Sequence, residues 1–202
     1  MTEFVTRKQI RLNGHDYSSP GYYFITVCSR NKENIFGTFV KNDIVVGSPL
    51  ACDRDREMNP TNGIELSTAG KIIEKQWNKI PDEYANVELD LYVIMPNHIH
   101  GIILIIEPVR ERTHEPVRER TRAQASRAPT TLSGMIRSFK SRSSMEYLNY
   151  IKEKNLGLSA KIWQRSFHDH IIRNEKSLHA IREYILSNPV NWEQDVENIL
   201  NS

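Results

Sequence analysis

Two neighbouring runs of β-forming residues, 87–94 and 98–106, constrain the fold of this chain most strongly. The first run, VELDLYVI, alternates between apolar and polar side chains, as a half-buried strand does. Its expected apolar face consists of Val87, Leu89, Leu91 and Val93. The second run, HIHGIILII, is apolar on both faces beyond its first turn, which is typical of a central, covered strand. Because only three residues separate the runs, we expect them to pair as an antiparallel hairpin.

Further elements on either side of this hairpin predict an α+β fold. In chain order they are a strand, a hairpin, a helix, two strands, a helix, a short strand and a helix. A small sheet with helices packed on one face fits this order better than parallel βαβ repeats do. The predicted ranges outside the central hairpin are strand 22–29, hairpin 38–47 around Asn42-Asp43, helix 67–80 stopped by Pro81, helix 131–154, a short strand within 162–173, and a helix capped by Asn174 and ended by Pro189.

The composition predicts one folded domain over residues 1–202 and excludes several classes of protein. With 39% hydrophobic and 26% charged residues, the chain can bury a core. Cys28 and Cys52 are too few for a disulfide framework or a cysteine-based zinc site. The N-terminus lacks the apolar core of a signal peptide, and the most apolar stretch, 91–106, is interrupted by a proline, an asparagine and two histidines. We therefore expect a cytoplasmic protein.

Residues 107–129 contain a tandem duplication and differ from the strand- and helix-forming segments around them. EPVRERTH is followed at once by EPVRERTR, and no apolar period runs through the segment, so we expect a flexible charged insertion. From Glu107 to Arg165 the chain carries thirteen basic and six acidic residues, a net charge of +7. This asymmetry suits a polyanion on one side of the protein, although a solvated surface explains it equally well.

Three cations that follow the insertion are more informative than the net charge. Arg137, Lys140 and Arg142 lie among five serines in the helix expected at 131–154. A mixture of cations and small hydroxyl groups suits contacts with phosphate. These three residues are therefore predicted to bind a nucleic-acid backbone.

Two histidines open the predicted central strand. His98 and His100 are two residues apart, so both imidazoles project from the same face and could form half of a divalent metal site. The alternative is that the spacing is incidental. His168 and His170 have the same spacing and are a rival pair.

The last predicted helix carries a second candidate element. Tyr184 and Asn188 are four residues apart and share one helical face. Each has a structural explanation, since the phenol could pack at a helix–sheet boundary and the asparagine could terminate the helix before a proline. Together with the histidines they fit one reaction, because a tyrosine nucleophile attacking a phosphodiester needs a Lewis acid. Two imidazoles and one amide oxygen would suit Mn²⁺ or Mg²⁺.

These residues resemble a known family. MPNHIHGIILI is similar to the HUH motif of single-tyrosine transposases that act on single-stranded DNA. WQRSFHDHIIRNEKSLHAIREYILSNPVNW resembles the tyrosine helix of their REP-associated branch, and GYYFITVCSRNKENIFG resembles the first strand and loop. The resemblance covers the chain apart from residues 48–63 and 107–129, and the downstream YxxxNP pattern is specific.

The resemblance implies a ferredoxin-like or RRM-like antiparallel sheet and a set of residue roles. His98, His100 and Asn188 would bind a divalent metal, Mg²⁺ or Mn²⁺, and Tyr184 would be the nucleophile. The protein would cut single-stranded DNA near hairpins through a 5′-phosphotyrosine and rejoin strands, as a monomer or a homodimer. The asparagine four residues after the tyrosine is similar to the REP-associated members, whereas the duplicated insertion departs from the family pattern.

Other residues bear on how a nucleic acid would bind. Tyr22 and Tyr23 could stack on unpaired bases, with packing in a core strand as the alternative, and Arg165 could reach phosphate. A different class of function is also open, namely a non-catalytic single-stranded nucleic-acid-binding module on an RRM-like sheet. The same chemistry in plasmid replication or mobilisation is a third hypothesis.

Overall fold

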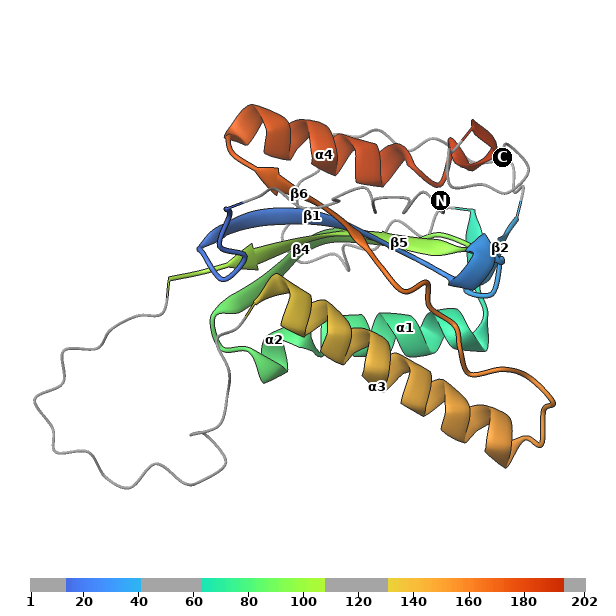
Figure 1. Cartoon of the computed structure of the whole chain (residues 1–202). Coiled ribbons are helices and arrows are strands. Elements are labelled where there is room, and N and C mark those ends of the chain that lie inside the picture. Colours follow the sequence, from blue (N-terminus) through green and yellow to red (C-terminus); the bar gives the residue numbers. More distant parts are fainter. Residues whose placement is uncertain (1–13, 41–62, 108–130, 195–202) are drawn as a thin grey trace, which may run out of the picture.

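A four-stranded antiparallel sheet forms the centre of the protein (Figure 1). The computed structural model describes residues 14–40, 63–107 and 131–194. The strands of the sheet lie in the order β4-β5-β1-β6. Their bounds are β1 Gly21–Cys28, β4 Val87–Ile94, β5 His98–Ile105 and β6 His168–Ile172. The predicted hairpin of β4 and β5 is confirmed, as is the central position of β5, which pairs with β1 on its other side.

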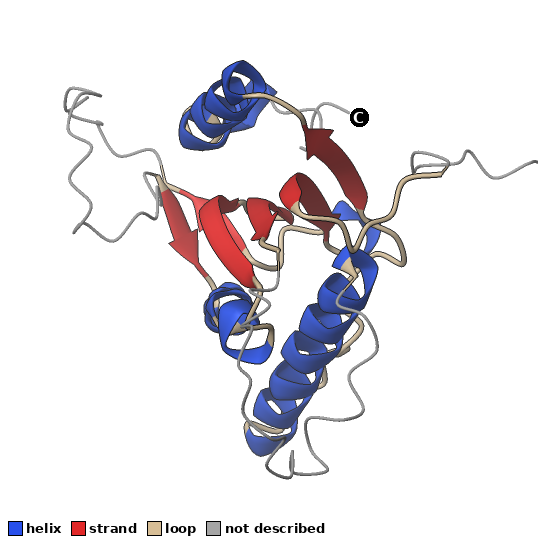
Figure 2. Ribbon diagram, turned by 90° about the vertical axis from the view of Figure 1, so that its left-hand side faces the viewer, coloured by secondary structure: helices blue, strands red, loops and turns tan. Residues whose placement is uncertain are grey.

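Helices cover both faces of this sheet. α1 (Thr68–Asn78) and α3 (Leu132–Glu153) lie on one face, and α4 (Glu175–Ser187) lies on the other (Figure 1, Figure 2). The α+β class is confirmed, but the expectation that the helices pack on one face is correct only for α1 and α3. The physical reason is that β5 carries apolar side chains on both faces, and each of these faces must be covered.

Two hydrophobic clusters correspond to the two faces. The first, between the sheet and helices α1 and α3, includes Ile25, Trp77, Ile103 and Phe139. The second, between the sheet and α4, includes Val93, Ile102, Leu178 and Ile185. α4 is therefore held by apolar burial over the sheet face that carries the two histidines of β5.

A β-bulge in β4 changes the face that its side chains occupy. The pairing with β5 shifts by one residue between Leu89 and Tyr92. Val87 and Leu89 consequently pack with the α1 and α3 cluster, whereas Leu91 and Val93 pack with the α4 cluster. The prediction that these four residues share one face is wrong, because one extra residue in a strand of period two moves every later side chain to the opposite face.

Shorter elements complete the described chain. β2 (Gly37–Phe39) pairs with β3 (Ile64–Leu66), and residues 41–47 of the hairpin predicted at 38–47 lie outside the described residues. The other short elements are the 3₁₀ turn η1 (Arg30–Lys32), α2 (Ile80–Glu83) and the 3₁₀ turn η2 (Trp192–Gln194). The predicted insertion, apart from Glu107, also lies outside the described residues.

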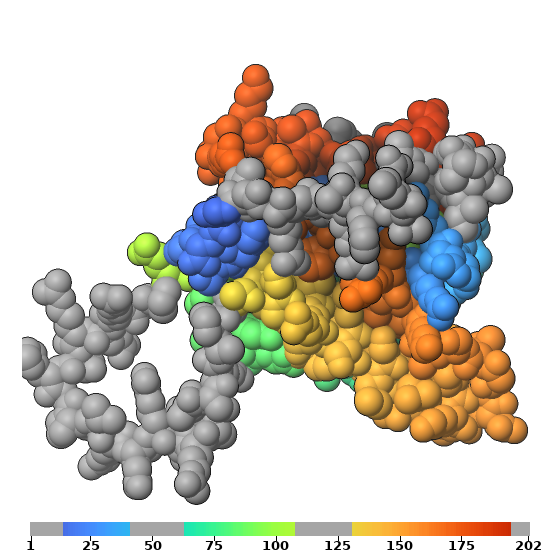
Figure 3. Space-filling view, in the orientation of Figure 1, coloured from blue at the N-terminus to red at the C-terminus, as the bar shows by residue number. Residues whose placement is uncertain are grey.

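The helix starts follow the capping residues in the sequence. The side chains of Ser67, Thr131 and Asn174 each accept a hydrogen bond from a backbone amide in the first turn of α1, α3 and α4, respectively. In the space-filling view the end of α3 and the segment after it project from the body of the protein (Figure 3). Within the described residues, no helix has the length and hydropathy needed to cross a membrane.

Candidate functional site

The two histidines of β5 lie side by side on the face covered by α4. His98 and His100 are opposite Cys28 and Thr26 of β1, and their ring centroids are 4.3 Å apart. Both side chains are buried, with exposed fractions of 0% and 3%. Strands on both sides of β5 hold its backbone in place, so the spacing of the rings is fixed by the sheet. The prediction that the two imidazoles share one face is confirmed.

Asn97 orients the ring of His98. The Asn97 amide nitrogen donates a hydrogen bond to the carbonyl oxygen of Lys32 at 3.0 Å, which directs its Oδ1 toward the histidine. Nδ1 of His98 donates to this oxygen at 2.8 Å. The neutral ring therefore carries its proton on Nδ1 and its lone pair on Nε2. Burial, assisted by the charge of Lys32, lowers the pKa of His98 to about 3, so the ring is in the neutral form that binds metals.

His100 connects the sheet to α4. Its Nδ1 is 2.8 Å from Oγ1 of Thr26, and its Nε2 is 3.1 Å from the hydroxyl oxygen of Tyr184. Phe24 stacks on His100, with centroids 5.3 Å apart, and meets Tyr184 edge-on. The side chain of Tyr184 is 42% exposed, so its phenol contacts the imidazole and remains accessible to a macromolecule. The strand imidazoles and the helical phenol thus meet, although 84 residues separate Tyr184 from His100 in the chain.

An ion pair fixes α4 against the edge strand β4. Nη2 of Arg182 is 2.5 Å from Oδ2 of Asp90, and Nε of Arg182 donates to Oδ1 of Asp90 at 3.1 Å. This two-point contact constrains rotation of the helix about its axis as well as its position. Arg182 lies two residues before Tyr184, so the ion pair helps to set the direction of the phenol.

Asn188 follows α4 on the same side of the helix as Tyr184. It is the C-cap residue and is 3% exposed. Four residues further on, the ring of Trp192 is 6.1 Å from that of His98. In the sequence, Asn188 lies midway between Tyr184, whose ring is next to His100, and Trp192, whose ring is next to His98. Its Oδ1 is buried and accepts no hydrogen bond from any described residue. A buried amide oxygen of this kind is a candidate ligand for a cation.

The donor set fits a divalent cation with open coordination positions. Among the described residues, no group of three His, Cys, Asp or Glu side chains is placed to hold a metal. A site built on His98 and His100 therefore needs a ligand of another type, and the buried amide oxygen of Asn188 is the candidate. Two imidazole nitrogens and one neutral oxygen leave positions for water and phosphate, as a catalytic site requires.

The rival histidine pair has a different environment. His168 and His170 lie on the edge strand β6, opposite Thr26 and Phe24 of β1. They therefore share a sheet face with His100, but both are exposed. An exposed pair on an edge strand is held less rigidly than the buried pair on β5. The buried environment favours His98 and His100 over His168 and His170 as candidate metal ligands.

Of the three α3 cations predicted to bind phosphate, two have structural partners. The ammonium group of Lys140 donates to the carbonyl oxygens of Gln164 and Ser166 at 2.5 and 3.1 Å, and burial lowers its pKa to about 8. Arg142 pairs with Glu83 of α2 and donates to Oε1 of Gln76 of α1 at 3.2 Å. These contacts join helices and loops on the face opposite α4, so we withdraw Lys140 and Arg142 as DNA contacts.

Arg137 is the third of these cations, and its side chain is exposed on α3. It therefore remains available to a phosphate.

The two tyrosines at the start of β1 point to opposite faces of the sheet. Tyr23 is 1% exposed in the α1 and α3 cluster, and its hydroxyl donates to the carbonyl oxygen of Ser19 at 2.8 Å. A ring with almost no exposed surface cannot stack on a base, so the expectation for Tyr23 is withdrawn in favour of core packing. Tyr22 is half-buried beside the α4 cluster and keeps part of its ring accessible.

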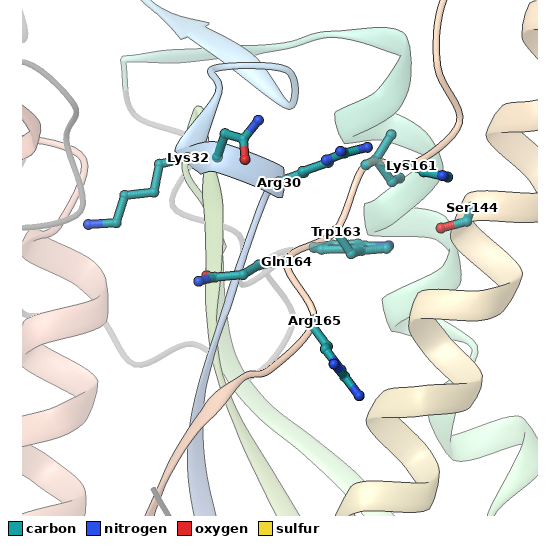
Figure 4. A pocket seen from close by; sticks show the side chains of 9 residues that line it. Arg30, Lys32, Ser144, Lys161, Trp163, Gln164 and Arg165 are labelled. Atoms are coloured by element: carbon teal, nitrogen blue, oxygen red, sulfur yellow. The ribbon is translucent and has the colours of Figure 1, made fainter. Parts of the chain in front are cut away.

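Arg165 lies in a pocket beyond the carboxyl end of β1. The pocket has a volume of about 500 Å³ and includes Trp163 and Gln164 (Figure 4). Arg165 is exposed there, which is compatible with the predicted contact to phosphate.

Several residues of the site were not predicted from the sequence. Thr26 and Asn97 position the two imidazoles, and Asp90 with Arg182 positions the tyrosine helix. Asn97 could have been identified, because it directly precedes His98 in the turn of the hairpin. The Asp90–Arg182 pair spans 92 residues and has no local signal in the sequence.

Comparisons with known proteins place the chain among its relatives. No family model matches it. An uncharacterized protein of Haemophilus influenzae is 35% identical over 190 residues, which cover 94% of this chain and 91% of the relative.

Two solved structures are similar to this one. One is a REP-associated tyrosine transposase bound to a REP hairpin, with a TM-score of 0.47 and 18% identity over 92% of this chain and 74% of the other. The second is a protein of Deinococcus radiodurans R1 assigned provisionally as a transposase, with a TM-score of 0.37 and 12% identity over 87% of this chain and 95% of the other.

The sequence relationship extends over nearly the full length of both chains. The aligned region of the Haemophilus influenzae relative includes most of the elements described above, because only a small fraction of this chain lies outside it. The protein therefore belongs to the same family as that Haemophilus influenzae protein.

Proposed function

We propose that this protein is a metal-dependent single-stranded DNA endonuclease and strand transferase that acts through Tyr184. The observation that carries the proposal is the 3.1 Å separation between the Tyr184 hydroxyl oxygen and Nε2 of His100. It joins the candidate nucleophile to the candidate metal ligands in one site, and the buried oxygen of Asn188 lies on the same helix end. A phenol exposed beside two oriented, neutral imidazoles suits attack on a phosphodiester.

The reaction proposed here is a transesterification. Tyr184 releases its phenolic proton to solvent, and its oxygen attacks the scissile phosphorus. An O–P bond to the tyrosine forms, the P–O3′ bond breaks, and the departing oxygen takes up a proton to become a 3′-hydroxyl. The 5′-phosphate then stays on Tyr184, and attack by a 3′-hydroxyl on this phosphotyrosine reverses the steps and joins strands without ATP.

The protein's own residues prepare this step in several ways. His98, His100 and Asn188 would hold Mg²⁺ or Mn²⁺, which when bound supplies a Lewis acid for the phosphoryl oxygens. Asn97 and Thr26 keep the imidazoles in place, and the Arg182–Asp90 pair keeps α4 over the sheet. The Tyr184 side chain is 42% exposed, so its hydroxyl group can exchange the hydrogen bond with Nε2 of His100 for a contact with phosphate.

We infer that the tyrosine acts in cis and that a monomer is sufficient for cleavage, because apolar burial holds α4 over the sheet that carries His100. A homodimer with exchanged helices would require α4 to leave the apolar cluster formed by Leu178 and Ile185.

A non-catalytic module on an RRM-like sheet is less well supported. Such a module would need aromatic side chains exposed on an open sheet face to stack on bases. Here α4 covers that face, and Phe24 contacts His100 and Tyr184 beneath it. The arrangement favours a closed site around the phenol over an open platform.

The proposal is tested by trapping the covalent intermediate. The protein is incubated with Mn²⁺ and hairpin-bearing single-stranded DNA, and a protein–DNA adduct that resists denaturation is sought on a gel. The adduct is expected with the unmodified protein and with Tyr150→Phe, which makes the same chemical change on α3. It should be absent in Tyr184→Phe and strongly reduced in His98→Ala and His100→Ala. An undiminished adduct in Tyr184→Phe would refute the nucleophile assignment.

A further inference from the structure

A pocket at the end of β1 concentrates positive charge. Its volume is about 500 Å³, and four cations line it, Arg30, Lys32, Lys161 and Arg165, whereas no carboxylate does. Within residues 14–40, 63–107 and 131–194, Arg30, Lys161 and Arg165 form no ion pair. Three exposed cations without a protein counter-charge, gathered around one hollow, attract an anion.

Trp163 gives this pocket an aromatic wall. Its indole nitrogen donates to Oγ of Ser143 at 2.9 Å, and its ring packs against Phe36 and Phe139 with centroid distances of 5.0 and 5.3 Å. The rest of the ring is accessible and lines the pocket. Figure 4 shows Arg30 and Arg165 on opposite sides of the indole. A fixed aromatic ring between cations is the combination that binds a base and its phosphate.

The backbone connects this pocket to the candidate metal site. The amide of Gln164 donates to the carbonyl oxygen of Cys28 at 3.0 Å, and Cys28 is the residue opposite His98 across β1 and β5. The amide of Arg30 donates to the carbonyl oxygen of Ile162 at 2.9 Å. The segment 162–164 therefore extends the sheet at the end of β1, and the pocket and the histidine pair adjoin the same end of that strand.

The cations of the pocket lie at the end of the sheet, where a bound strand could reach both sheet faces. Consecutive residues of an extended segment alternate between faces, so Gln164 and Trp163 project in opposite directions. In Figure 4, Gln164 and Lys32 point away from the side on which Arg30, Lys161 and Arg165 surround the indole. A flexible single strand could cross the sheet edge here, whereas a rigid duplex could not follow such a turn.

We propose that this pocket binds one nucleotide of the unpaired DNA next to the cleaved phosphodiester. Its phosphate would lie between Arg30, Lys161 and Arg165, and its base would lie against Trp163. The identity of the substrate rests on the proposed function, but the binding itself requires no cleavage. The pocket would thereby set the path of the strand through the site.

Binding is measured in the Tyr184→Phe background, so that no strand is cut. Fluorescence anisotropy reports the affinity for a labelled DNA hairpin with single-stranded flanks, at several salt concentrations. Arg30→Ala, Lys161→Ala and Arg165→Ala should each weaken binding and lower the slope of log affinity against log salt by about 1. Lys71→Ala removes an exposed cation from α1, far from the pocket in the sequence, and is the matched control. Pocket variants that bind as tightly as this control would overturn the proposal.

Changes in the DNA test the base contact without altering the protein. Scanning a single abasic site through the flanks should locate one position where binding weakens about fivefold or more. A Trp163→Leu variant should lose its sensitivity at that position, because the abasic site and the substitution remove the same stacking contact. Equal binding at all positions would refute the contact with Trp163. Failure of Tyr184 to form an adduct, with these binding effects intact, would refute the proposed function and leave the pocket assignment standing.

Discussion

Replacing Asn97 with alanine tests how the sheet prepares His98. The substitution removes the hydrogen bond to Nδ1 of His98 at 2.8 Å and the hydrogen bond to the Lys32 carbonyl oxygen at 3.0 Å. His98 and Asn97 are fully buried, so water cannot readily replace the lost partners. At about 1–2 kcal/mol for each interrupted contact, the free energy of unfolding should fall by about 2–4 kcal/mol.

Metal binding should change by a separate mechanism. Without the Asn97 oxygen, the proton of His98 is no longer confined to Nδ1, and the ring is no longer held in its orientation. Loss of a partner that orients a metal ligand reduces affinity by about 10- to 100-fold. Calorimetric titration with Mn²⁺ measures the change in metal affinity, and urea unfolding measures the change in the free energy of unfolding.

Asn34→Ala is the control for both measurements, because Asn34 is exposed and follows closely after Lys32, whose carbonyl oxygen accepts the hydrogen bond from Asn97. It should leave metal affinity and unfolding unchanged. Wild-type Mn²⁺ affinity in folded Asn97→Ala would refute the argument that Asn97 prepares His98 as a ligand.

Four other predictions follow from the geometry. Arg182→Met should lower the free energy of unfolding in urea by about 1 kcal/mol. Adduct formation on the gel should fall by more than the loss of folded protein explains, because the substitution loosens α4. Gly101→Ala should destabilise the protein by about 1–3 kcal/mol in urea unfolding, because the new Cβ would be 2.5 Å from Cζ2 of the buried Trp77. Burial raises the pKa of Tyr23 above its usual 10.0, so the folded state disfavours the phenolate and stability should fall as pH rises through 10; Tyr23→Phe should show a smaller fall in pH-dependent urea unfolding. Mn²⁺ at 100 times its Kd should stabilise the protein by about 2.7 kcal/mol in thermal unfolding, and Asn188→Ala should lose most of this gain.

The sequence was most informative where a pattern is local. The run HIHGIILII is apolar on both faces, and it forms the central strand β5 with its two histidines on one face. The capping side chains of Ser67 and Asn174 correctly marked the starts of α1 and α4. In each of these cases the physical cause acts over a few neighbouring residues.

The errors arose where a distant contact decides. The bulge in β4 depends on its pairing with β5 and reverses the face of Leu91 and Val93. Lys140 has the flanking residues of a phosphate contact, yet its ammonium group binds carbonyl oxygens of a segment 24–26 residues away. The placement of α4 on the second face follows from the apolar character of both faces of β5.

The candidate site depends both on local sequence patterns and on contacts between distant residues. The i, i+2 histidines and the i, i+4 pair of Tyr184 and Asn188 could be identified from spacing and from the family resemblance. Their convergence could not, because it depends on α4 docking over the sheet through Leu178, Ile185 and the Asp90–Arg182 pair. The supporting residues were missed for the same reason.

Mass spectrometry of the trapped protein–DNA complex tests the central claim most directly. Residues 183–202 contain no lysine or arginine and a single tyrosine, so trypsin leaves Tyr184 in one peptide with all of them. After reaction with Mn²⁺ and hairpin DNA, this peptide should carry the 5′-phosphate end of the cut strand on Tyr184. Attachment of the DNA to any other residue would contradict the assignment of this phenol, held beside His100, as the group that attacks the phosphodiester.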